Sequence, residues 1–354
     1  MIIVYALLFL VSFFPKTVWA VYDPISVPNN KFGIHIADSN DLSEVPALVN
    51  SSGGDWGYVT FVITDTDRDV GKWQLIFRNL RNLHLIPLVR IATHVEGSSW
   101  VNPYPQDANE WVSFFSQLPW PTNNRYVILF NEPNHATEWG GTIAPDQYAV
   151  IVKTFAQKLK ESSSEYFILP AGFDASAQNT GESLDEAGYL SWMLTSEPHL
   201  FDYLDGWTSH SYPNPGFSGS PYARGRGTLT TYDWELGMLK ERGVVKNLPV
   251  FITETGWAHN GGSDWSRMLP PDVVANYLTI AAASVWNDSR IVAVTPFLYQ
   301  YQEPLFSMFS WLIPSNREPY PFYVSYQLLS KIRGNPILPP SSEYLALISH
   351  TLSL

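Results

Sequence analysis

The chain has 354 residues, enough for one large domain or two ordinary ones. It carries 33 acidic and 21 basic residues, a net charge of −12, without a cluster of Lys and Arg. This balance argues against nucleic acid or an anionic membrane surface as a partner. Because there are no cysteines, disulfides and thiolate metal sites are excluded, and a core of this size does not need them.

Residues 1–20 are predicted to be a secretory signal peptide. An apolar stretch runs from Ile2 to Phe14, and Val18-Trp19-Ala20 supplies acceptable residues at the cleavage positions. The stretch is short for a membrane span. We therefore expect a secreted, extracellular protein whose folded part is residues 21–354, with no transmembrane segment there. An uncleaved N-terminal anchor is the competing interpretation.

From residue 31 onward, apolar strand-like segments alternate with amphipathic helix-like segments. Eight strands are expected, over residues 32–37, 57–63, 86–91, 126–131, 167–171, 206–209, 250–253 and 291–297. Helices are expected after capping boxes at Asp107…Glu110 and Ser183…Glu186, and from Pro145. The fold class is therefore α/β. Both a (β/α)₈ (TIM) barrel and a doubly wound sheet have this alternation.

The lengths of the links favour a single (β/α)₈ barrel. Helix-to-strand links, such as 82–85 and 161–165, are short. Strand-to-helix links are long and rich in Gly, Pro and aromatic residues; they cover 93–106, 134–144, 211–228, 258–270 and 299–321. A barrel builds its active site from links of this second kind.

Two glutamates end strand-like segments, Glu132 in RYVILFNEPN and Glu254 in PVFITETGW. Each is expected at the C-terminal tip of a buried strand. Two carboxylates that face one cleft are what acid/base and nucleophilic chemistry on a glycosidic bond requires. Asn131, beside Glu132, is placed to hydrogen-bond a sugar 2-hydroxyl. For each glutamate alone, an acidic residue that merely closes a strand is the alternative.

The two glutamates fall on the fourth and seventh expected strands. In this arrangement the chain resembles glycoside hydrolase clan A, the (β/α)₈-barrel retaining glycosidases, and in particular the cellulase-like families 5 and 39. The resemblance rests on the NEP and TETGW segments and on strand order over residues 21–354. It implies a retaining double displacement through a covalent glycosyl-enzyme, with Glu132 as acid/base and Glu254 as nucleophile.

The resemblance also implies supporting roles for residues that match clan positions. His210 and Tyr212 follow the sixth strand, where the clan often has His-x-Tyr. Tyr212 is expected to donate to Glu254, and His210 to bind substrate or Glu132. A buried histidine bonded to the backbone is the alternative for His210.

Arg90, in PLVRIA, is expected near the nucleophile, where its charge would lower the carboxyl pKa. The clan usually carries this arginine after the second strand, whereas here it falls on the third. His35 ends the first strand and is expected to reach the cleft and bind substrate. An ordinary polar strand end is the alternative for His35.

Aromatic residues are expected to bind sugar rings. Trp257 is assigned to the cleft floor, and Tyr299 is expected to replace the tryptophan that the clan commonly has on strand eight. Three further tryptophans lie in links on the presumed active face and favour an extended glycan cleft, with packing inside their own links as the alternative: Trp100, Trp139 and Trp265.

No nucleotide, dinucleotide, metalloprotease or serine-hydrolase motif is present, so neither cofactor nor metal is expected. The sequence therefore predicts a secreted, monomeric retaining glycoside hydrolase that cleaves β-glycosidic bonds in a poly- or oligosaccharide. It does not choose among glucose, mannose and xylose, or between endo and exo cleavage. A transglycosylase on β-glycans and a non-catalytic glycan-binding barrel are the alternatives.

Overall fold

The computed structural model describes residues 21–262, 268–340 and 344. The predicted signal peptide, residues 1–20, and Trp265 lie outside these ranges. Among the described residues, no helix is long and apolar enough to cross a membrane.

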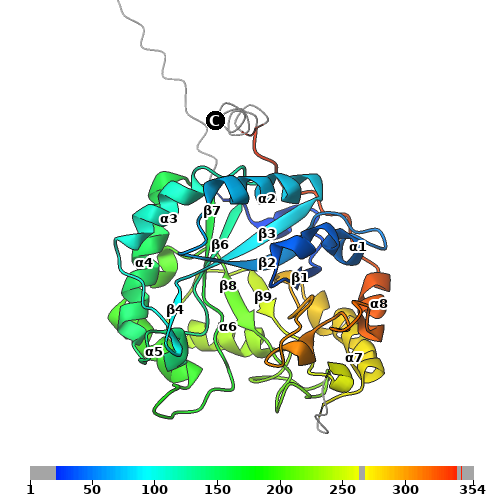
Figure 1. Cartoon of the computed structure of the whole chain (residues 1–354). Coiled ribbons are helices and arrows are strands. Elements are labelled where there is room, and N and C mark those ends of the chain that lie inside the picture. Colours follow the sequence, from blue (N-terminus) through cyan, green and yellow to red (C-terminus); the bar gives the residue numbers. More distant parts are fainter. Residues whose placement is uncertain (1–20, 263–267, 341–343, 345–354) are drawn as a thin grey trace, which may run out of the picture.

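Within those ranges, eight parallel strands alternate with eight α-helices (Figure 1). The strands are β1 (Gly33–His35), β2 (Gly57–Thr64), β3 (Leu85–Ala92), β6 (Arg125–Leu129), β7 (Tyr166–Pro170), β8 (Trp207–His210), β9 (Val250–Glu254) and β10 (Ile291–Val294). The helices are α1 (Val45–Val49), α2 (Val70–Asn82), α3 (Asp107–Phe115), α4 (Pro145–Ser162), α5 (Glu186–Ser196), α6 (Thr231–Glu241), α7 (Pro271–Ala283) and α8 (Pro321–Leu328). An antiparallel hairpin, β4 (Val95–Glu96) and β5 (Ser99–Trp100), lies in the link after β3. Every expected strand is confirmed, with its ends shifted by a few residues.

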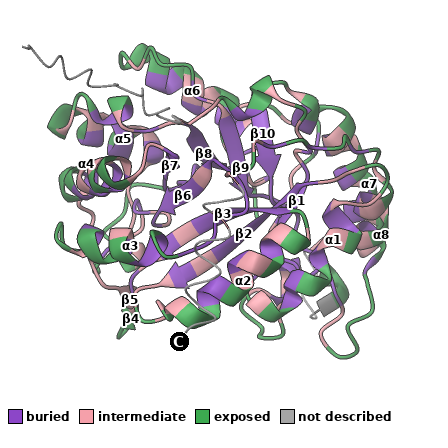
Figure 2. Ribbon diagram, turned by 90° about the horizontal axis from the view of Figure 1, so that it is seen from above, coloured by how far each residue is buried: buried purple, intermediate pink, exposed green. Residues whose placement is uncertain are grey.

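The eight strands form two parallel sheets that meet at both edges. One sheet has the order β1-β2-β3-β6-β7 and the other β10-β9-β8. A parallel bridge pairs Phe32 with Val294 beside β1 and β10. At the other edge, Asp205 N donates to Ile168 O of β7 at 2.8 Å. Figure 2 shows the buried strands in the middle and the helices around the outside.

In strands such as β6 and β7, alternate residues enter two different apolar cores. In β6, Tyr126 and Ile128 join an inner cluster, whereas Val127 and Leu129 join the outer cluster under the helices. The inner cluster draws on both sheets, and the Tyr126 ring lies 5.4 Å from the Phe251 ring of β9. Burial on both faces explains why the strands are almost continuously apolar in sequence.

Both predicted capping boxes are wrong in detail, although the helices exist. Asp107 is the first residue of α3, and its carboxylate accepts from Tyr104 N at 2.8 Å instead of capping the helix. Asp185 caps α5 by accepting from Ala187 N at 3.0 Å, in place of Ser183. Several short oxygen-bearing side chains near a helix start compete for the same amides, and pattern alone does not decide among them.

A pair of carboxyl groups is buried between α5 and α6. Glu186 and Glu235 are both fully buried. Glu235 Oε2 accepts from the Trp207 indole N–H at 2.8 Å, whereas in the described structure no donor reaches either oxygen of Glu186. Burial raises the pKa of both carboxyls, and the neighbouring charge of Glu235 raises the pKa of Glu186 further. Both effects favour the neutral form of Glu186.

The pKa of the Glu186 carboxyl is higher in the folded than in the unfolded state. The contribution of this carboxyl to the free energy of unfolding is therefore fully present at acid pH, where it is protonated in both states. That contribution is lost as the pH rises through the folded-state pKa. We predict that Glu186→Gln raises the free energy of unfolding at pH 8 by about 1–3 kcal/mol, and changes it much less at pH 4. Denaturant unfolding at both pH values measures this, with the exposed Glu161→Gln as control. An equal change at both pH values would contradict the prediction.

Candidate active site

A cavity of about 790 Å³ opens at the carboxyl ends of the strands. Its lining comes from the strand tips and from the links after β3, β6, β7, β8 and β10. This is the class of link from which the sequence predicts the active site. Glu132 and Glu254 both line the cavity, so the two strand-tip glutamates meet in one cleft.

The two glutamates are mounted differently. Glu254 is the last residue of β9 and is 8% exposed. Glu132 follows the end of β6, where Phe130 and Glu132 adopt positive φ angles of 72° and 29° that turn the chain sharply. Glu132 N donates to Gly172 O at 3.0 Å, which ties this turn to the link after β7.

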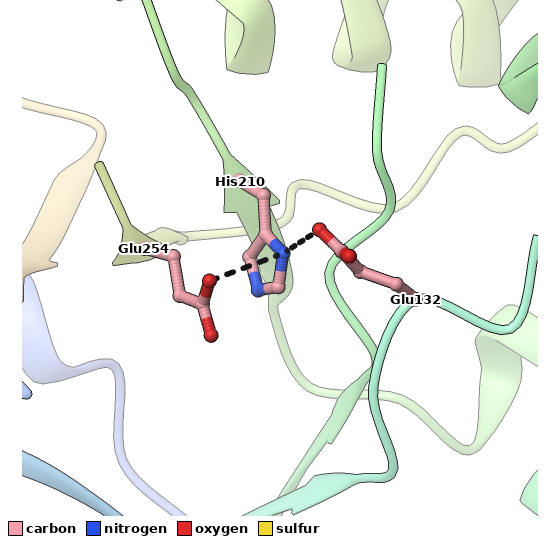
Figure 3. Close-up of side chains that lie close together, drawn as sticks. All are labelled: Glu132, His210 and Glu254. Atoms are coloured by element: carbon pink, nitrogen blue, oxygen red, sulfur yellow. Dashed lines mark hydrogen bonds and ion pairs between the residues drawn. The ribbon is translucent and has the colours of Figure 1, made fainter. Parts of the chain in front are cut away.

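His210 lies between the two carboxylates (Figure 3). Its Nδ1 is 2.7 Å from Glu132 Oε1 and 3.9 Å from Glu254 Oε2. One oxygen of each glutamate and a ring nitrogen of His210 lie within 4.8 Å of one another. The nearest oxygens of Glu132 and Glu254 are therefore no more than 4.8 Å apart.

Two donors hold the Glu254 carboxylate. Arg90 Nη1 donates to Oε1 at 2.6 Å, and the Tyr212 hydroxyl donates to Oε2 at 3.0 Å. Burial alone would raise the pKa of Glu254, but the positive charges of His210 and Arg90 outweigh it and bring the pKa to about 2. Glu254 is therefore an ionised carboxylate at neutral pH. The sequence placed Arg90 and Tyr212 correctly beside it.

The pKa values of the two histidines of the cleft are shifted in opposite directions. Burial lowers the pKa of His210, but the charge of Glu254 and the hydrogen bond with Glu132 outweigh burial and raise it. Burial, together with the charge of Arg90, lowers the pKa of His35 to about 3, so His35 is neutral at neutral pH. His35 Nδ1 lies 3.8 Å from Glu254 Oε1, beyond hydrogen-bond distance. As expected, His35 reaches the cleft, where its uncharged imidazole forms part of the wall.

Gly172 leaves the space that His210 occupies. A Cβ at this position would lie 2.2 Å from His210 Cδ2 and 2.4 Å from Nε2, far inside contact distance. Any larger residue would push the imidazole away from Glu132. The sequence alone does not reveal this requirement for glycine, because it arises from the packing of β7 beside β8 in the fold.

Two of the expected sugar-binding aromatics do not line the cleft. The Trp257 indole N–H donates to Gly219 O at 2.8 Å, and its ring packs on Tyr277. The Tyr299 hydroxyl donates to Glu44 Oε2 at 2.8 Å. Both side chains are almost completely buried away from the cavity, 2% and 1% exposed, so the substrate-binding roles predicted for Trp257 and Tyr299 are corrected.

Other aromatic residues supply the cleft wall. Phe297, just beyond β10, lines the cavity where Tyr299 was expected, and its ring meets His35 edge-on at 5.1 Å. Trp139 and Trp100 line the opposite wall, as expected. Trp139 is only 1% exposed, because its indole N–H donates to Gln147 Oε1 at 2.9 Å and its ring packs in the core.

Several cleft residues were missed by the sequence analysis: Glu138, Asp174, Asn214 and Phe297. Phe297 carried a usable signal, because it ends the last expected strand, 291–297. Glu138 sits in the same link as Glu132, six residues on. Asp174 and Asn214 lie in links outside helices and strands, where the sequence has no hydrophobic periodicity from which the direction of a side chain could be predicted.

Glu132, His210 and Glu254 offer three atoms close enough to ligate a divalent cation. The donor set fits catalysis better than it fits a metal. His210 Nδ1 is already bonded to Glu132 Oε1, and Arg90 places a permanent positive charge against Glu254. A cation at this point would have to displace both interactions.

No protein-family model and no curated protein sequence matches the chain. Several solved structures with similar folds are glycoside hydrolases. A monomeric β-xylosidase from Caulobacter crescentus CB15 is 14% identical with a TM-score of 0.57, over 85% of this chain and 68% of that one. A mannanase catalytic domain from Streptomyces sp. SirexAA-E is 13% identical with a TM-score of 0.53, over 92% and 94%. A GH128 endo-β-1,3-glucanase from Sorangium cellulosum is 16% identical with a TM-score of 0.51, over 85% and 97%.

These neighbours belong to the TIM-barrel glycoside hydrolase families of clan A. The resemblance inferred from the NEP and TETGW segments is therefore confirmed at the level of the fold. At these identities the comparison shows the fold alone.

The Arg90–Glu254 contact predicts how activity depends on pH. Removing the guanidinium in Arg90→Met raises the pKa of Glu254, so the carboxylate becomes protonated at a higher pH as acid is added. The acid limb of the kcat/KM profile should move to higher pH, and kcat/KM at neutral pH should fall roughly 100-fold. Arg333→Met, which removes a charge from a side chain that is 81% exposed, is the control. An unchanged acid limb would contradict this role of Arg90.

Proposed function

We propose that the protein is a secreted retaining glycoside hydrolase that cleaves β-glycosidic bonds in a poly- or oligosaccharide. The observation that carries the proposal is the pair of carboxylates in one cleft, with oxygens within 4.8 Å and one of them held ionised by Arg90. The meeting of the two sheets at both edges supports a closed (β/α)₈ barrel as the scaffold.

The reaction has two displacements. In the first, an oxygen of ionised Glu254 attacks the anomeric carbon, while protonated Glu132 gives its proton to the departing glycosidic oxygen. In the second, Glu132 takes a proton from water, and the resulting hydroxide attacks the anomeric carbon and releases Glu254. The Glu132 side chain is 23% exposed and Glu254 10%, which suits a group that exchanges protons with water and a nucleophile that is shielded from it.

The surrounding residues assist these steps. Arg90 and Tyr212 keep the nucleophile ionised and aimed. His210 holds the Glu132 carboxyl from the side facing Glu254. Asn131 lies beside Arg90, in position for the 2-hydroxyl of the sugar bound at Glu254. Trp100 and Phe297, which are partly exposed, supply ring surface for that sugar and its neighbours, whereas the buried Trp139 supports the wall from behind.

By their names, the similar structures include a β-xylosidase, a mannanase and an endo-β-1,3-glucanase. We propose a substrate from the same broad group and a protein that acts as a monomer outside the cell. The two displacements described above use only side chains of the protein and water, so the proposal includes no cofactor.

A hydrolysis screen tests the proposal. The purified protein and its Glu254→Gln variant are incubated with β-glucans, mannans, xylans and aryl β-glycosides. We predict cleavage of one class by the parent, with net retention of anomeric configuration, and a loss of at least about 1,000-fold in Glu254→Gln.

Other outcomes would select a different function. Tight glycan binding by both proteins, with no turnover by the parent, would favour the non-catalytic glycan-binding barrel. Longer products at high sugar concentration, at the expense of hydrolysis, would favour the transglycosylase. Release of the inverted anomer would overturn the double displacement.

A further inference from the structure

A third carboxylate enters the cleft without a role in the steps above. Glu138 ends the short 3₁₀ helix η3 (Ala136–Glu138), in the link that follows β6 and carries Glu132, and it lines the cavity. The segment is firmly held. Trp139, the next residue, is buried, and its backbone N–H donates to Ala136 O at 3.0 Å.

Glu138 begins a run of hydrogen bonds that ends at the nucleophile. Its Oε2 accepts from Asn131 Nδ2 at 3.2 Å. Asn131 Oδ1 accepts from Arg90 Nη1 at 2.7 Å, and the same Nη1 donates to Glu254 Oε1 at 2.6 Å. The Asn131 amide is therefore hydrogen-bonded on both sides: its oxygen accepts from the Arg90 guanidinium, and its nitrogen donates to the Glu138 carboxylate.

The chemistry of the two partners fixes which way the amide points. A guanidinium can only donate hydrogen bonds, and an ionised carboxylate can only accept them. Reversing the amide would place two donors together at Arg90 and two acceptors together at Glu138. The second hydrogen on Asn131 Nδ2 has no partner among these residues and is left for a substrate.

We propose that Glu138 is a positioning residue that holds the Asn131 amide so that its free N–H meets the 2-hydroxyl of the sugar bound at Glu254. The inference rests on the proposed glycosidase function. Contacts to the 2-hydroxyl strengthen in the transition state of glycoside hydrolysis, so Glu138 acts on the rate through Asn131. Burial and the charge of Glu132 raise the pKa of Glu138 to about 6, so it is an acceptor above that pH.

The test compares substrates that have and lack the 2-hydroxyl. The probes are the 2,4-dinitrophenyl β-glycoside of the sugar that the parent cleaves and its 2-deoxy analogue. Glu138→Leu should lower kcat/KM about 10- to 100-fold on the 2-hydroxy substrate and less than about threefold on the 2-deoxy analogue. Glu138→Gln, whose Oε1 can still accept from Asn131, should restore the preference for the 2-hydroxyl. Glu161→Leu, which removes an exposed carboxylate, is the matched control.

Two further variants protect the test against misfolding. Glu138→Ala repeats the comparison with a smaller side chain, and thermal unfolding verifies that each variant is folded. Adding Glu138→Leu to Asn131→Ala should cause little further loss, because the two residues act as one unit.

Three results would overturn the inference. Equal losses on both substrates would mean that Glu138 does not act through the 2-hydroxyl. A Glu138→Gln variant that hydrolyses activated aryl glycosides but not substrates with poor leaving groups would make Glu138 the general acid instead. Absence of hydrolysis by the parent would overturn the proposed function together with the inference, whereas the first two results leave that function standing.

Discussion

An arginine held 2.6 Å from the Glu254 carboxylate is the interaction on which the rest of the site depends. The two side chains are only 14% and 10% exposed, so water screens their attraction weakly. Burial alone would raise the pKa of Glu254 and favour the neutral acid, and the charges of His210 and Arg90 together outweigh it. Arg90 also donates to Asn131 Oδ1, and one guanidinium therefore both helps to keep the nucleophile ionised and fixes the position of its neighbour.

The same ion pair places a demand on the fold. Arg90 interrupts an otherwise buried strand, β3, and belongs to the five-stranded sheet, whereas Glu254 belongs to the three-stranded sheet. A charge in such a place needs a partner within reach. The partner of Arg90 is Glu254, which lies on the opposite sheet. The two side chains can meet only because the two sheets face one another across the interior. The inner ring contacts, such as Tyr126 with Phe251, hold the sheets at that distance.

The sequence was most informative at strand tips. Glu132 and Glu254 could be placed because an apolar run that ends in a charged residue fixes both an element and its end, whereas Arg90 was placed by its resemblance to the arginine of clan A. Beyond the tips the alternation stops, and side-chain direction depends on contacts distant in sequence. For this reason Tyr299 was wrongly assigned to the cleft. Its side chain points away from the cleft, and its hydroxyl donates to Glu44. Glu138 was missed for the same reason, because nothing in its link predicts that it points at Asn131.

The central claim is that Glu254 forms a covalent bond to the sugar, and trapping the intermediate tests it most directly. A 2-deoxy-2-fluoro β-glycoside with a dinitrophenyl leaving group slows release of the glycosyl-enzyme more than its formation. Peptide mass spectrometry should then find one fluoroglycosyl group, attached to the peptide that carries Glu254, with loss of activity in proportion to labelling. Attachment at Glu132 or Glu138, or steady turnover without any labelled peptide, would contradict the account.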